Sequence, residues 1–196
     1  MKKHHFFATL GMLFIIVGLV VLMSPVDTAQ DDVGATVPEP PEVLTGFYDM
    51  WVASPHADVT AEAFNHWNED DPQEVPASCA QCHSTTGYQD YVGQDGSDVG
   101  SVESAQPIGQ TVTCDACHSP AAIGLESVTF PSGAELANVG DATRCIVCHQ
   151  GRESGLSVAN DIADAGVTDM NEVNEELGFI NIHYYAAAAS LYGGEV

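Results

Sequence analysis

Three copies of one short pattern, Cys-x-x-Cys-His, contain all six cysteines of this 196-residue chain. The cysteines are Cys79, Cys82, Cys114, Cys117, Cys145 and Cys148, and the histidines that close the copies are His83, His118 and His149. Two thiols on one turn of chain can each form a thioether with a vinyl group of the same porphyrin, while the next residue directs an imidazole at the iron. The pattern therefore predicts three covalently attached c-type haems, with these histidines as the proximal iron ligands.

Other cysteine chemistries explain this pattern less well. Three disulfides would suit an exported protein, but they give no reason for a histidine after every second cysteine. Structural zinc and iron–sulfur clusters favour cysteines in groups of four, which leaves one of the three pairs over. Zinc and disulfides remain the alternatives to haem.

The remaining histidines match the three haems in number. When the proximal ligands and the two histidines of the N-terminal segment are set aside, three are left, namely His56, His66 and His183. The match predicts that these three are the distal ligands, with two histidines on every iron, although each taken singly is better explained as a surface or core residue. Met50 and Met170 are the alternative distal ligands, and methionine more often fills an apolar gap. The sequence does not pair a distal histidine with a particular haem.

The chain begins with a segment typical of export. Residues 6–23 carry no charge and would span about 27 Å as a helix, close to the thickness of a bilayer core. Lys2 and Lys3 place the N-terminus inside, so the rest of the chain is expected outside the cytoplasm, in the periplasm or at the cell surface. We expect residues 1–26 to be a signal peptide or a retained membrane anchor, residues 27–45 an acidic, Pro-rich tether, and residues 46–196 a trihaem cytochrome c domain.

Negative charge dominates the chain beyond this segment. It carries 28 acidic side chains and only two basic ones, Arg144 and Arg152, a formal −26. Such a field repels phosphate backbones, so nucleic acid is excluded as a partner. Both arginines flank the third motif, and we expect one or both to hold haem propionates, because a guanidinium binds a carboxylate with two parallel hydrogen bonds. A surface pair with Asp141 or Glu153 is the alternative for each arginine.

Regular secondary structure is expected to be sparse. Helical character appears in two pieces between residues 46 and 69, with Ser54 and Pro55 as the cap and first-turn pair of the second piece. Residues 70–132 show neither a helical nor a strand period. Helices are expected again at 168–177 and 183–192. The fold class predicted is mainly α with low regular secondary structure, in a compact domain organised around three haems.

Several longer segments resemble those of the multihaem c-type cytochromes of respiratory bacteria. They are S-P-H-A-D and F-N-H-W before the first motif, C-H-Q-G-R-E-S at the third, and I-N-I-H-Y-Y-A-A-A-A-S-L-Y-G near the end. Some relatives carry more haems and stack them into extracellular filaments. The resemblance implies that His56, His66 and His183 are distal ligands. In such relatives the Ala-rich segment continues into further haem motifs, whereas this sequence ends at Val196, as a short member or a truncated reading frame would.

These features predict an electron carrier and not an enzyme. Iron with two strong axial ligands has no open position for a substrate, and paired histidines predict low to intermediate potentials. We expect other redox proteins or cytochromes as electron donor and acceptor, and the membrane as a partner if residues 6–23 are retained. The alternatives are a subunit of a multihaem reductase with one open haem and a protomer of a larger cytochrome assembly.

Overall fold

The computed structural model describes residues 44–171, 173–183 and 186–193. All of them fall in one compact unit of the chain, Pro40–Val196. The segment predicted as a signal peptide or anchor and residues 27–43 of the predicted tether lie outside the described residues. Within the described part, no helix is both long and apolar enough to cross a membrane.

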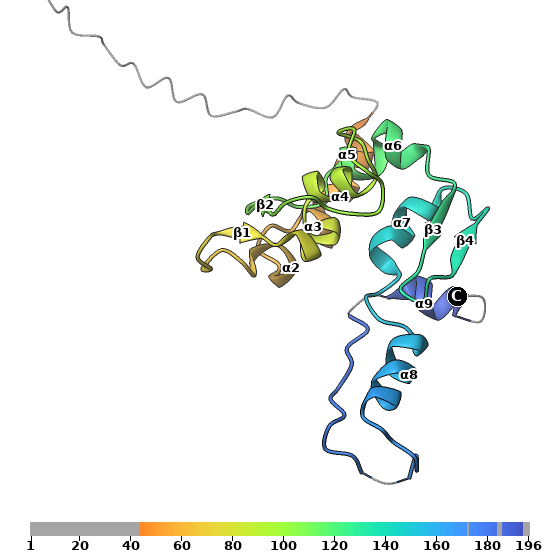
Figure 1. Ribbon diagram of the computed structural model, residues 1–196. Helices are drawn as coiled ribbons and strands as arrows, with labels where there is room; N and C mark the ends of the chain where they lie inside the picture. The colour runs from red at the N-terminus through yellow and green to blue at the C-terminus, as the bar shows by residue number, and fades with distance from the viewer. Residues whose placement is uncertain (1–43, 172, 184–185, 194–196) are drawn as a thin grey trace, which may run out of the picture. The chain divides into compact units, whose positions relative to one another are not determined.

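Short helices make up most of the regular structure (Figure 1). They are α1 (Thr45–Val52), η2 (Pro55–Ala57, a 3-10 turn), α2 (Glu62–Asn65), α3 (Ala77–His83), α4 (Thr85–Tyr91), α5 (Cys114–His118), α6 (Pro120–Ile123), α7 (Ala142–His149), α8 (Gly155–Asp164) and α9 (Ala187–Tyr192). The prediction of a mainly helical fold with little regular structure is confirmed. Ser54 has extended backbone dihedrals and Pro55 begins the next turn, as expected, although that turn is only three residues long.

Each haem motif occupies its own helix and ends it at the motif histidine. After each of the first two motifs, a serine caps the start of the next helix. Ser84 accepts a hydrogen bond from the Gly87 amide at 2.9 Å, and Ser119 accepts one from the Ala122 amide at 3.3 Å. Serine is a good N-cap, so Cys-His-Ser gives two helices with a sharp break between them. The third motif is followed by Gln150 and has no such restart.

Two short antiparallel strand pairs accompany the helices. Strands β1 (Glu74–Val75) and β2 (Gln106–Pro107) pair across the α3 and α4 helices that separate them in sequence, with Val75 opposite Gln106. Strands β3 (Ser127–Thr129) and β4 (Glu135–Ala137) form a hairpin, the second pair, with Val128 opposite Leu136. Val75, Val128 and Leu136 are buried, so each pair contributes apolar side chains to the interior.

The segment after the third motif differs from the prediction. Helix α8 was not predicted, although Ser154 and Ser157 form a capping box at its start. The helix predicted at 168–177 is wrong: the described residues of this range are not helical. The side chain of Asp169 accepts a hydrogen bond from the Asn171 amide at 2.9 Å, and Asn174 accepts one from the Glu176 amide at 2.8 Å. Such local bonds compete with the helix for backbone donors.

The interior among the described residues is small and has two parts. The larger joins side chains from the α4, α5, α6, α7 and α9 helices with both strands of the β3–β4 hairpin: Tyr88, Val92, Ala116, Ala122, Val128, Phe130, Leu136, Ile146, Val147 and Ala188. The smaller contains Trp67, Val75 and Ala80. Both lie under the motif helices, so the buried side chains fix these helices relative to one another.

Candidate haem-binding sites

The first motif lies on α3 and its histidine is held in one tautomer. The Nδ1–H of His83 donates a hydrogen bond to the carbonyl of Ala63 at 2.7 Å, which leaves Nε2 with a free lone pair, as an iron ligand requires. The ring packs edge-on against Trp67 and Phe64, with centroids 5.3 and 6.4 Å away. Burial lowers the pKa of His83, so the neutral imidazole that binds metal is favoured.

His183 faces this histidine from the C-terminal part of the chain. The two ring centroids are 5.8 Å apart and the ring planes are inclined by 81°. His183 has a positive φ of 80°, which is uncommon for a residue with a side chain. Its amide donates a hydrogen bond to the side chain of Asn181 at 2.9 Å, and this local bond supports the unusual backbone.

Gly151 lets the segment before His183 cross the end of the third motif. It has a φ of 88°, and an added Cβ would lie 2.9 Å from both the carbonyl oxygen and Cγ1 of Ile182. The next amide, of Arg152, donates to that carbonyl at 3.0 Å. A side chain at position 151 would therefore displace the segment that carries His183.

His56 faces the histidine of the third motif. The ring centroids of His56 and His149 are 6.1 Å apart, at an interplanar angle of 61°. The carbonyl of His56 accepts a hydrogen bond from the Val112 amide at 3.1 Å, and the Val112 carbonyl accepts one from the Trp51 indole at 2.8 Å. These bonds fix η2 against the strand-like segment before the second motif. Burial, together with nearby His149, lowers the pKa of His56.

The spacing of both pairs fits an iron between two histidines. Two imidazoles on opposite sides of one metal, each with a metal–nitrogen bond of about 2 Å, have ring centroids about 6 Å apart. The pairs His83–His183 and His56–His149 are at 5.8 and 6.1 Å. The residues present therefore fit bis-His haem at the first and third motifs.

The second motif, on α5, has a different environment. Cys114 and His118 are exposed, and among the described residues His118 has no ring contact with another histidine. His66 is not brought to it. The ring of His66 lies 5.0 Å from that of Trp67, on the first-motif side, and its Nδ1 is 2.8 Å from a carboxylate oxygen of Glu62. The described structure thus brings together two of the three expected ligand pairs.

Hydrogen bonds join all three motif regions; between the first and the second, the Thr113 amide donates to the Thr85 hydroxyl at 2.9 Å. Helix α3 joins α7 through the Gln81 side chain, which donates to the Val147 carbonyl at 2.9 Å, and through the Cys148 thiol, which donates to the Gln81 carbonyl at 3.6 Å. Cys82 and Cys148 are also close enough to hydrogen-bond, which lowers the pKa of Cys82 and raises that of Cys148.

A second set of contacts joins α7 to the second motif. The guanidinium of Arg144 donates to the Cys117 carbonyl at 3.2 Å, and the hydroxyl of Tyr88 donates to the Arg144 carbonyl at 2.8 Å. Tyr88 lies beneath both motifs, and burial raises its pKa far above the usual range. The third motif therefore touches both of the others.

The two arginines lie in different surroundings. Arg144 has a side chain that is only 16% exposed, and it forms an ion pair with Asp141 at 2.9 Å besides its bond to Cys117. Arg152 is exposed, and its charge reaches the first motif: it adds to the lowering of the Cys82 pKa, which comes mainly from the Cys148 hydrogen bond, and of the His83 pKa, which comes mainly from burial. Arg152 thus follows the third motif in sequence but lies near the first in space.

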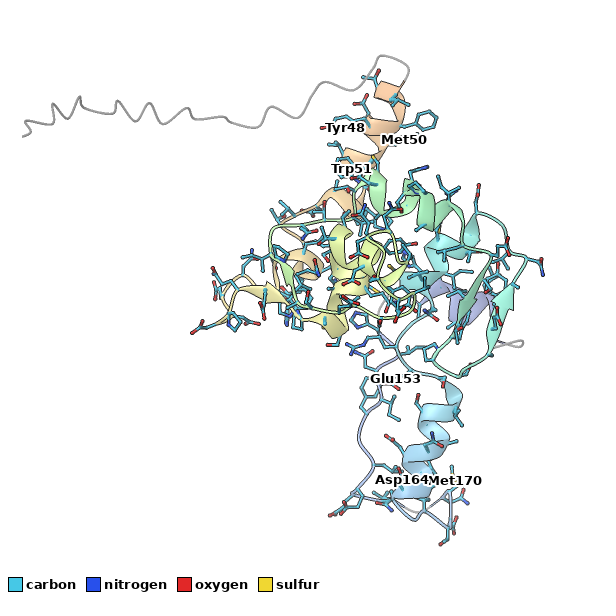
Figure 2. All side chains as sticks on the ribbon, turned by 45° about the horizontal axis from the view of Figure 1, so that its top comes forward. Tyr48, Met50, Trp51, Glu153, Asp164 and Met170 are labelled. Atoms are coloured by element: carbon cyan, nitrogen blue, oxygen red, sulfur yellow. The ribbon has the colours of Figure 1, made fainter. Side chains whose placement is uncertain are left out.

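Sequence reasoning missed the residues that position the ligands. They are Glu62, Gln81, Gly151 and Asn181, and none of them carries haem chemistry itself. A glycine two residues after the third motif histidine was a usable signal for a close backbone approach. The alternative distal ligands Met50 and Met170 are 63% and 71% exposed. Figure 2 shows them at opposite ends of the described unit, on α1 and beyond α8.

Comparisons with known proteins agree with this site chemistry. Residues 46–119 match the family model of cytochrome c554 and c-prime. The chain is also similar to two C-type polyheme cytochromes of Geobacter sulfurreducens: it is 26% identical to OmcB over 168 residues and 27% identical to OmcC over 169 residues. Each alignment covers 69% of this chain and 21% of the relative, so the chain spans about one fifth of the length of these relatives. No solved structure matches it.

Three attachment motifs, a helical fold built around them and these matches define the class: the chain is a multihaem c-type cytochrome. It is a distant relative of the polyheme cytochromes OmcB and OmcC, and its residues 46–119 resemble cytochrome c554 and c-prime. Proteins of this class are extracytoplasmic, and they are usually electron carriers rather than enzymes.

Proposed function

We propose that this protein carries electrons outside the cytoplasmic membrane through three covalently bound c-type haems. The observation that supports the proposal most strongly is the pair of histidine contacts, at 5.8 and 6.1 Å, each joining a motif histidine to one of the three histidines expected as distal ligands. Haem iron with both axial positions filled exchanges one electron at a time and leaves no site for a substrate.

The proposed residue roles follow from the motifs and from these pairs. Thioether bonds are assigned to the six cysteines, and the proximal positions to His83, His118 and His149. His183 is the distal ligand at the first motif and His56 at the third. The ligand count alone assigns His66 to the second motif; the described structure places its ring beside Trp67, on the first-motif side.

The chain itself supplies orientation and a dry environment. The Ala63 carbonyl holds His83 in the tautomer that presents Nε2, and the rings of Trp67 and Phe64 restrict its rotation. The carboxylate of Glu62 does the same for His66, since a carboxylate partner on Nδ1 orients an imidazole ligand and raises its basicity. These contacts restrict the orientation of both rings.

Hydrogen bonds between the motif regions support a group of closely spaced attachment sites. The third motif contacts the first through Gln81 and the second through Arg144. The Thr113 amide, directly before the second motif, donates to the hydroxyl of Thr85, just after the first, at 2.9 Å. We infer that the three sites form a compact group in which each lies near the other two. Closely spaced sites of this kind suit a conduit better than an isolated carrier.

Location and partners extend the proposal. We expect residues 6–23 to export the chain and, where retained, to anchor it to the cytoplasmic membrane, with the acidic domain facing other redox proteins. Two histidines on an iron, and the negative surface, favour the ferric state, which predicts low to intermediate potentials.

A second candidate function is a reductase subunit or a protomer of a larger cytochrome assembly. The observation that favours it is the exposed His118, which faces no histidine in the described part of the chain. An iron at this site with one ligand from the chain would have an open position for a small substrate or for a ligand from another protein.

Carbon monoxide separates the two candidates. The haem-loaded protein, reduced with dithionite at neutral pH, is titrated with carbon monoxide and followed by its Soret band. The carrier predicts no spectral change, because every iron has two histidines. Binding of one carbon monoxide per chain would indicate an open iron at the second motif and favour the second candidate function. Binding of two or three would contradict the pairs proposed for the first and third motifs.

A further inference from the structure

The segment after the third motif carries exposed apolar side chains. We call residues 155–182 the arm: it consists of α8 and the extended chain that returns beside it (Figures 1 and 2). The Val167 amide donates to the Ile162 carbonyl and the Asn174 side chain donates to the Ala165 carbonyl, both at 3.2 Å, so the two halves are joined. Val173 and Phe179 are 95% and 92% exposed. Exposed apolar side chains in such density mark interaction surfaces.

Acidic side chains surround these apolar residues. Five exposed carboxylates of the described arm are Asp161, Asp164, Asp169, Glu175 and Glu176, and the arm contains no lysine or arginine. A complementary partner must therefore be basic. A second copy of this chain does not meet this requirement, because its described part has only Arg144 and Arg152, and Arg144 already pairs with Asp141.

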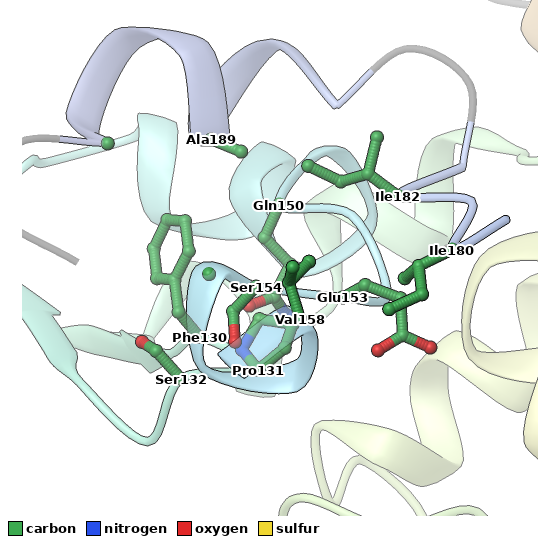
Figure 3. A pocket seen from close by; sticks show the side chains of 12 residues that line it. Phe130, Pro131, Ser132, Gln150, Glu153, Ser154, Val158, Ile180, Ile182 and Ala189 are labelled. Carbon is green, nitrogen blue, oxygen red and sulfur yellow. The ribbon is translucent and has the colours of Figure 1, made fainter. Parts of the chain in front are cut away.

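A cavity of about 340 Å³ opens at the base of the arm, between the arm, the β3–β4 hairpin and α9 (Figure 3). Its apolar wall includes Phe130, Val158 and Ile180. Its polar lining includes the carboxylate residue Glu153 and the amide of Gln150. The Gln150 side chain is buried; its Nε2 donates to the Val147 carbonyl at 3.1 Å, and its Oε1 accepts no hydrogen bond in the described structure.

This lining favours a ligand with a positive charge at the end of an apolar chain. The Glu153 carboxylate is an acceptor, so the ligand must supply N–H or O–H donors, and the apolar wall suits the methylene groups of a lysine or arginine side chain. The N-terminus of α8 lies at the cavity, and the helix dipole there, equivalent to about half a positive charge, repels a cation. Ser154 already caps that end, and the full charge of Glu153 exceeds the dipole. An anion would meet Glu153 in a chain of net charge −24.

We propose that the arm and this cavity form the docking site of a basic redox protein, one arginine or lysine of which enters the cavity. The proposal rests on the electron-carrier function. Gln150 directly follows His149, and Ile182 directly precedes His183, so a partner bound here lies beside ligands of the third and first sites. Electrons would therefore enter or leave through the first or the third site.

Electron transfer to a basic probe protein tests the site. The fully reduced, haem-loaded protein is mixed in a stopped-flow instrument with ferric mitochondrial cytochrome c, which is basic, over a range of ionic strengths. Three variants change the site: Glu153→Gln, Phe179→Ser and Val158→Trp, which fills the cavity. Three matched variants change the exposed loop after α4: Asp98→Asn, Val99→Ser and Val99→Trp.

Each site variant is expected to lower the second-order rate constant about three- to tenfold at low salt, and Glu153→Gln also to flatten its salt dependence, because charged and apolar docking groups act on encounter and orientation. The loop variants are expected to leave the rate unchanged. Equal rates for site and loop variants would overturn the docking site. Haem content and circular dichroism identify a misfolded variant. If Val158→Trp does not fold, the surface substitutions Glu153→Gln and Phe179→Ser still test the site.

A small oxidant separates this proposal from the function on which it rests. Ferricyanide needs no docking arm, so it should oxidise the wild type and every variant at one common rate. If ferricyanide oxidises them alike and the probe protein does not distinguish site from loop variants, only the docking site fails. If the reduced protein transfers no electrons even to ferricyanide, the electron-carrier function itself fails.

Discussion

The first and third motifs differ from the second in how their surroundings are built. His83 and His149 each face a histidine from a distant part of the chain, and α3 and α7 pack against each other. Helix α5 is also held by distant residues, through the Arg144 guanidinium, the Gln89 side chain and the hydrogen bond between Thr113 and Thr85, but its His118 is exposed. Long-range contacts therefore position all three motif helices, but they bring a facing histidine only to the first and the third.

This difference indicates which parts of the chain determine the second histidine at each site. The motif itself needs only one helical turn, and all three copies form it. The opposite ligand needs a second segment held in place by bonds far from the motif, such as those from Trp51 to Val112 and from Arg152 to Ile182. Variants that act on these segments should change one haem at a time.

The largest effect is expected from loss of a facing histidine. His183→Ala and His56→Ala should each convert one low-spin ferric haem per chain to high spin and add one carbon monoxide per reduced chain, because each leaves one iron with an open position. Electron paramagnetic resonance and a carbon monoxide titration measure both changes. Met170→Ala, which alters an exposed residue, is the control. Unchanged spectra in both histidine variants would contradict the assigned pairs.

Gly151→Ala should give the next largest effect. The added methyl group would lie 2.9 Å from Ile182 in a backbone conformation that side chains rarely adopt, so the segment carrying His183 must shift. We expect a partial high-spin fraction at a single haem and a lower melting temperature. Gly155→Ala, where nothing lies within 4 Å of the new Cβ, is the matched control. A fully low-spin Gly151→Ala protein would show that this crossing does not position the ligand.

Arg152→Ala should shift the potential of one haem. Removal of a positive charge near Cys82 and His83 makes the reduced state less favourable, so the midpoint potential of the first-motif haem should fall by on the order of tens of millivolts, less at high salt. A spectroelectrochemical titration resolves the three potentials. A shift of the third-motif haem, with the first unmoved, would show that sequence proximity and not the observed placement decides which haem the arginine serves.

The smallest change at the first and third sites is expected from His66→Ala. His66 faces neither of the motif histidines that have partners, so both haems should stay low-spin and any new high-spin signal should belong to the second motif. Glu62→Gln, which removes the charge of the carboxylate beside His66, should act in the same direction but more weakly. If His66→Ala removes a low-spin haem from a protein that also lacks the Cys114 and Cys117 attachment, His66 belongs to another site.

Much of the chemistry could be predicted from the sequence, because the residues that attach a haem covalently are neighbours in the chain. The helical class and the identification as a multihaem cytochrome are confirmed. The pairing of His183 with the first motif and of His56 with the third was not predictable, since it depends on Gly151, on Val112 and on a positive φ at His183. The helix expected at 168–177 failed because Asp169 and Asn174 bind their own backbone, a competition that residue periodicity does not register.

Intact-protein mass spectrometry tests the central claim most directly. The chain is produced with haem-maturation machinery, unfolded in acid and weighed, so that only covalently bound haem remains. The account predicts three haem additions per chain, and the loss of one addition when Cys114 and Cys117 are both replaced by alanine. Fewer than three additions in the wild type, with all six cysteines intact, would contradict it.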